Sequence, residues 1–241
     1  MSAAPISNPQ LVYQEALVNY LVSMARTVER NVQKALDSLL RGPDASSTNL
    51  ASEVFLAEPR INEMEMLIDE HSVRLLRAGN LTDDEIRLTV AALKITNDLE
   101  RMGDLAVNIA QRIISLEQMA VVELPEQMPA MISAVRAMVT KCFGALIYRN
   151  VVLATEVLES DDVVDRYRDQ IFEHLLIAME SDPRQISPNM QFVLASRYLE
   201  RIADHATNIA EDTIFWLRGL DVRHGRALQA ANGPMRLTQN S

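Results

Sequence analysis

The feature that most constrains the fold of this chain is an internal repeat. LERMGDLAVNIA (99–110) and LERIADHATNIA (199–210) share eight of their twelve residues and lie 100 positions apart. Self-similarity at a fixed spacing indicates a structural unit that occurs more than once. A weaker echo lies upstream, between SEVFLAEPRIN (52–62) and TEVLESDDVVD (155–165). We therefore expect a tandem duplication in which each half carries one copy of the unit.

Both halves are predicted to be helical throughout. Apolar residues recur at intervals of three and four, as Leu17, Leu21, Met24 and Val28 do near the N-terminus. Seven Gly and nine Pro among 241 residues leave few of the tight turns that strands need. The breaks in the pattern divide the chain into six helical segments, over about residues 9–40, 50–78, 82–119, 130–148, 151–179 and 189–218.

Two local signals refine these boundaries. Thr82 followed by Glu85 is a capping box, which predicts the start of the third helix. Pro59 lies inside the second segment and predicts a kink or a break there.

The expected fold class is all-α, with six helices arranged as two pseudo-symmetric three-helix bundles. The first bundle spans residues 9–120 and the second spans residues 130–221. Residues 121–129 form the expected linker, and residues 222–241 an expected flexible tail.

Charge and cysteine content narrow the classes of partner and compartment. The net charge of −10 disfavours nucleic acid, since surfaces that bind a duplex carry a basic excess. One cysteine, Cys142, excludes an internal disulfide and fits a reducing compartment. The first residues show no signal peptide, and no run reads as a transmembrane segment. We expect a cytoplasmic protein.

Each copy of the repeat places two acids four residues apart, Glu100 with Asp104 and Glu200 with Asp204. Like charges at this spacing repel on a helix, at a cost of a few tenths of a kcal/mol. One interpretation is a solvated face that nearby arginines neutralise. The other is a site for a hard cation such as Mg, Mn, Ca or oxidised iron, which prefers oxygen ligands. The preceding helix of each half would then add ligands, from Glu65, Asp69, Asp161, Asp165 and Asp169.

Other kinds of site find little support in the sequence. The four histidines are scattered, and none follows a Glu by three residues as bundle di-iron sites require. His205 adjoins Asp204, although we expect it to be a surface histidine. The chain has no glycine-rich phosphate-binding motif and no pattern that positions a nucleophile.

At the two copies of the repeat the sequence resembles the PhoU family of bacterial phosphate transport and signalling proteins. The resemblance is carried by residues 90–112 and 196–219, which contain the doubled L-E-R-x-x-D-x-x-x-N-I, and by residues 58–76 and 161–176. It extends over about residues 12–222. Ala203 stands where many family members have glycine.

The resemblance implies two three-helix bundles whose acid-x-x-x-Asp motifs can hold divalent or iron ions. Glu100, Asp104, Glu200 and Asp204 match those motifs directly. It also implies a non-enzymatic adaptor that modulates high-affinity phosphate uptake and restrains the phosphate-starvation response. The implied partners are the ATPase subunit of an ABC phosphate transporter and a sensor histidine kinase, and we further expect a homodimer. The alternatives are a metal-dependent phosphohydrolase and a structural or metal-binding helical protein.

Overall fold

The two copies of the repeat lie on two long helices, α4 (Asp83–Glu117) and α8 (Ile186–Arg218), at the centre of the structure. The structure is a computed structural model that describes residues 9–119 and 123–223, without the side chains of Pro9, Ala45 and Asp161. The two helices run antiparallel and make the most extensive helix–helix contact in this part of the chain.

The described residues are helical almost throughout and contain no strand, so the predicted all-α class is confirmed. In each half a short helix and a 21-residue helix precede the long repeat helix, whereas the first helix has 33 residues in the first half and 21 in the second. Along the described chain the helices are α1 (Pro9–Arg41), α2 (Ala45–Phe55), α3 (Glu58–Ala78), α4, α5 (Met128–Tyr148), α6 (Val151–Leu158), α7 (Asp161–Ser181), the 3-10 helix η1 (Pro183–Gln185) and α8.

The second helical segment of each half is broken in two. Pro59 lies in the first turn of α3, so the break predicted at this proline is confirmed. In the second half one unbroken helix was expected over residues 151–179, and that expectation is wrong. The chain leaves the helix between α6 and α7, where the Ser160 hydroxyl donates to the Glu156 carbonyl (2.7 Å) instead of capping α7.

The two halves match in the length of the helix that precedes the repeat helix, and each has a polar capping residue ahead of the repeat helix. α3 and α7 each contain 21 residues. The Thr82 hydroxyl accepts from the Glu85 backbone N–H, and the Glu85 carboxylate accepts from the Thr82 backbone N–H, which confirms the predicted capping box. The residue 100 positions later, Asp182, caps η1 by accepting from the backbone N–H of Arg184, two residues on, whereas Thr82 accepts from Glu85, three residues on.

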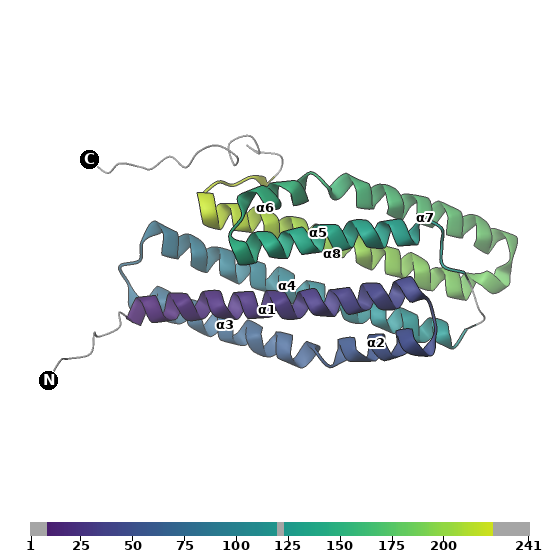
Figure 1. Ribbon diagram of the computed structural model, residues 1–241, viewed down its shortest axis with the longest axis horizontal. Coiled ribbons are helices and arrows are strands. Elements are labelled where there is room, and N and C mark those ends of the chain that lie inside the picture. The colour runs from purple at the N-terminus through teal and green to yellow at the C-terminus, as the bar shows by residue number, and fades with distance from the viewer. Residues whose placement is uncertain (1–8, 120–122, 224–241) are drawn as a thin grey trace.

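The halves lie side by side and share one core (Figure 1). The buried apolar residues from Leu17 to Val222 form a single cluster rather than two separate ones. α1 packs against α5 as α4 packs against α8, and Arg136 of α5 pairs with Asp37 of α1 at 2.7 Å. Two three-helix units are therefore present, but four long helices join them into one body.

α5 is long and apolar enough to cross a membrane by length and composition alone. Half of its most apolar window is buried inside the protein, where it contacts α8 and α1. Burial of this kind is what a core helix requires. The predicted flexible tail lies outside the described residues from 224 onward, and so do residues 120–122, where the predicted linker begins.

α3 approaches α4 most closely at Gly103, inside the first copy of the repeat. A Cβ added to this residue would lie 3.1 Å from Cδ1 of Ile61 on α3, closer than ordinary van der Waals contact. The missing side chain therefore lets the two helices pack together beside the acidic pair. The corresponding residue of the second copy, Ala203, is buried as well.

We expect Gly103→Leu to lower the free energy of unfolding by about 1–3 kcal/mol, because the new side chain overpacks the α3–α4 contact. Denaturant unfolding measures the change. Combining it with Ile61→Ala makes room for the new side chain, so the double variant should lose less stability than the two single losses predict together. Strict additivity would contradict the assignment of this contact.

Candidate functional site

The repeated acids of the first half lie where α4 packs against α3. Glu65 of α3 and both Glu100 and Asp104 of α4 are half-buried and interact with one another. Burial raises the pKa of Glu100 above its ordinary value, and the nearby charge of Asp104 and a hydrogen bond with it raise the pKa further. Burial and the charges of Asp69 and Asp104 likewise raise the pKa of Glu65. This cluster therefore resists carrying its full negative charge.

Few positive groups offset that charge. The Arg101 Nε lies 3.5 Å from Glu100 Oε2, but this arginine is mostly exposed and cannot neutralise three acids. Carboxylates of this kind are suitable ligands for a hard cation. Within residues 9–119 and 123–223, however, no three His, Cys, Asp or Glu side chains are grouped so that they could hold a metal ion. Metal binding by Glu100, Asp104, Glu65 and Asp69 therefore stays a prediction.

The equivalent acids of the second half surround an arginine. Arg168 of α7 donates from Nη1 to Glu200 of α8, and its Nη2 lies 2.8 Å from Oδ1 of Asp169. The same Nη1 is 3.5 Å from Oδ1 of Asp165. Burial acts to lower the pKa of Arg168, but the hydrogen bond with Asp169 and the surrounding carboxylates outweigh it and raise the pKa. The solvated-face interpretation anticipated neutralising arginines on α8 itself, whereas the neutralising group comes from α7.

The remaining predicted ligands separate from one another. Asp204 is exposed on α8, and the side chain of Asp161 lies outside the described part of the structure. Asn208 follows Asp204 by four residues on α8. Its Nδ2 donates to Oδ1 of Asp98 on α4, at 3.2 Å. The polar residues of α8 thus contact two different helices: Glu200 contacts α7, and Asn208 contacts α4.

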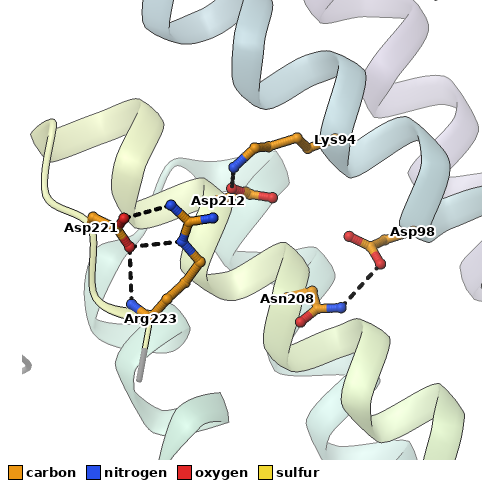
Figure 2. Close-up of polar contacts among 6 residues, drawn as sticks. All are labelled: Lys94, Asp98, Asn208, Asp212, Asp221 and Arg223. Carbon is orange, nitrogen blue, oxygen red and sulfur yellow. Dashed lines mark hydrogen bonds and ion pairs between the residues drawn. The ribbon is translucent and has the colours of Figure 1, made fainter. Parts of the chain in front are cut away.

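Asp98 is the centre of a polar contact between the halves. Its carboxylate is 8% exposed and accepts from two α8 residues, Asn208 (Figure 2) and His205, whose Nδ1 lies 2.7 Å away. His205 was expected at the surface, and that expectation is wrong because α4 covers one side of its ring. A buried carboxylate that loses its partners is costly, so this contact holds α8 in register with α4.

A second polar contact crosses the same interface about one helical turn away. Lys94 Nζ of α4 lies 2.9 Å from Oδ1 of Asp212 on α8, and Arg223 pairs with Asp221 beside it (Figure 2). Burial raises the pKa of Asp212, and the charge of Lys94 offsets part of this rise. Lys94 Nζ also lies 5.8 Å from the centre of the Phe215 ring. The two contacts together fix the antiparallel arrangement of the repeat helices.

Asp98 and His205 can be recognised in the sequence by comparing the two copies of the repeat. Asp98 and His205 stand where the other copy of the repeat has Tyr198 and Leu105. A polar residue that replaces an apolar one in only one copy indicates a contact that the duplication does not explain. Arg168 is a similar departure, since it lies between Asp165 and Asp169 on the acidic face of its helix.

Comparison with known proteins places both halves in one family. A family profile described as "PhoU domain" matches residues 21–113 and again residues 128–213. The phosphate-specific transport system accessory protein PhoU homolog of Pseudomonas aeruginosa is 37% identical over 213 residues, which cover 87% of this chain and 86% of that protein. The protein of the same description from Clostridium acetobutylicum is 30% identical over 86% of this chain and 94% of its own length.

Solved structures agree with the sequence matches. The crystal structure of PhoU from Pseudomonas aeruginosa aligns with a TM-score of 0.80 at 34% identity, over 87% of this chain and 99% of that one. The PhoU structure from Streptococcus pneumoniae aligns with a TM-score of 0.76 at 22% identity, which supports the shared fold. The doubled domain confirms the duplication that the repeat predicted.

The first-half acids predict a pH-dependent stability. Their raised pKa values mean that the folded state binds protons more tightly, so stability falls as pH rises above the ordinary glutamate value of about 4.3. We expect Glu100→Gln in metal-free buffer to raise the free energy of unfolding by about 0.5 kcal/mol at pH 7. Below about pH 4 the difference should vanish, because the wild-type carboxyl is then protonated as well.

Urea unfolding at several pH values measures this difference. Glu63→Gln is the matched control, because Glu63 is exposed and lies two residues before Glu65, on another face of α3. It should change stability little at any pH. A destabilised Glu100→Gln protein at pH 7 without metal would show that the acids do not repel one another.

The contact between Asp98 and His205 predicts an energetic coupling between the halves. A double-mutant cycle with Asp98→Ala and His205→Ala should give about 1–2 kcal/mol of coupling, because each group is largely buried and depends on the other. The exposed pair Lys34 and Glu53, at 2.6 Å, serves as the reference and should give less than about 1 kcal/mol. Equal coupling in the two pairs would contradict a role for Asp98 in joining the halves.

Proposed function

The chain belongs to the PhoU family, and from that premise we propose that it is an accessory protein of a phosphate-specific transport system. In this role it modulates high-affinity phosphate uptake and restrains the phosphate-starvation response. The observation that carries the proposal is the double match of the PhoU domain over residues 21–113 and 128–213. Relatives of the same length that share about a third of its residues are named as accessory proteins of that system.

The proposed mode of action is that of an adaptor rather than an enzyme. Its partners would be the ATPase subunit of an ABC phosphate transporter and a sensor histidine kinase. A body in which long helices share one core suits this role, because it presents fixed surfaces for docking. The net charge of −10 favours partners with basic surfaces, and opposite charges speed their encounter. The homodimer and the cytoplasmic location expected from the sequence stay predictions.

The metal ions implied by the family are a separate part of the proposal. Oxygen-rich side chains near one another in the first half fit a hard cation by their chemistry. Such an ion would offset the repulsion between Glu65, Glu100 and Asp104 and would tie α3 to α4. Loss of this ion would alter the docking surfaces of the protein and would not affect a catalytic step.

We expect deletion of this chain's gene to switch on a phosphate-starvation reporter in phosphate-rich medium, and the wild-type chain to restore repression. Tagged protein from the same cells should co-purify with the transporter ATPase. Because the proposed attraction is electrostatic, the association should weaken by about tenfold or more between about 0.05 M and about 0.5 M salt.

The alternative functions give different results in the same system. A phosphohydrolase built on the acids would release phosphate from phosphorylated compounds in the presence of Mn²⁺, and Glu100→Gln with Glu200→Gln would abolish that activity. A purely structural or metal-storing protein would capture neither the ATPase nor the kinase, and its deletion would leave the reporter silent. Either result would overturn the adaptor proposal.

A further inference from the structure

The two halves differ in the group that neutralises their repeated acids. In the second half the guanidinium of Arg168 contacts Glu200, Asp169 and Asp165, which come from both α7 and α8. The Arg168 and Glu200 side chains are 28% and 20% exposed, so solvent screens their attraction less than at an open surface. The arginine therefore occupies the centre of the acidic group.

The first half has an acid at the same place. The segments IDEH (68–71) of α3 and IFEH (171–174) of α7 are similar. When they are aligned, Glu65 is at the position that corresponds to Arg168. Glu65 adds its charge to Glu100 and Asp104, whereas Arg168 cancels that of its neighbours. One substitution in the duplicated unit thus reverses the sign of the central group.

We infer that Arg168 is a built-in counter-ion which takes the place of a metal ion in the second half, so that the acids around it do not serve as a cation site. An arginine cannot give up its proton in a protein at any physiological pH, so the second-half acids are permanently paired. A divalent ion at Glu200 would have to displace the guanidinium or lie beside a like charge. The residues of the second half consequently do not fit the metal that the family resemblance implies for them.

The consequence is a functional asymmetry between two halves of one origin. Between α7 and α8 the protein supplies a positive charge of its own, that of Arg168. The contact of α3 with α4 contains acids that repel until a proton or a cation joins them. The two halves therefore differ in whether the protein itself supplies the counter-ion.

Arg168→Glu tests the inference by replacing the counter-ion of the second half with an acid, the residue type that the first half has at the corresponding position, Glu65. In chelator we expect its Tm to fall by about 2–4 °C relative to the wild type, because four acids then meet without a counter-ion. Titration with MnCl2 should restore the Tm, and calorimetry should show Mn²⁺ binding about tenfold or more tighter than any second-half binding in the wild type.

Arg166→Glu is the matched control. It makes the same charge change at an exposed position of α7, two residues from Arg168, and should gain no Mn²⁺ binding. Glu200→Gln with Asp204→Asn in the wild-type background should leave Mn²⁺ binding and its stabilisation unchanged. Arg168→Gln, which removes the charge but keeps a long polar side chain, decides the matter if Arg168→Glu does not fold.

Two results would overturn the inference. The first is a wild-type protein that loses bound Mn²⁺ when Glu200 and Asp204 are neutralised, since the second half would then be a metal site despite Arg168. The second is an Arg168→Gln or Arg168→Glu protein with unchanged Tm in chelator and no gain of Mn²⁺ over the Arg166→Glu control.

Discussion

The contact between α4 and α8 is the constraint on which the rest of the structure depends. Sixteen of the 35 residues of α4 are buried, and fifteen of the 33 residues of α8. A buried surface this wide cannot be covered by the two other helices of one half, because an amphipathic surface helix buries only one stripe. Each repeat helix therefore needs the other half as a partner, and the two bundles form one cooperative body with a single core.

That dependence explains where the duplicated sequence has diverged. Some core positions remain alike, such as the leucines Leu99 and Leu199, which are fully buried in both copies. Positions at the interface of the halves need not match, since a pair there consists of two different residues. Asp98 with His205 and Lys94 with Asp212 are such pairs, and each uses residue types that the other copy lacks. The divergence converts a symmetric contact into one with a fixed register.

The acidic residues follow a different logic, because they lie within each half rather than between the halves. Both copies of the repeat keep the acids four residues apart, at a cost in repulsion that helix formation alone does not reward. In the second half Arg168 removes this cost, and in the first half Glu65 increases it. The two clusters therefore differ in their charge balance, although they lie at corresponding places in the duplicated unit.

The sequence by itself determined the fold class, the duplication, the capping box at Thr82 and the break at Pro59. Each of these depends on residues close together in the chain or on a repeat visible in the letters, and local backbone physics is sufficient to interpret them. It also identified the acids of the repeat. It did not identify the break between α6 and α7, where no proline or glycine marks the chain. Only the tertiary structure decided which charges meet: Arg168 reaches Glu200 across 32 residues, and His205 reaches Asp98 across 107. A helical wheel gives the face on which a side chain lies, but the partner on that face is set by how the helices pack.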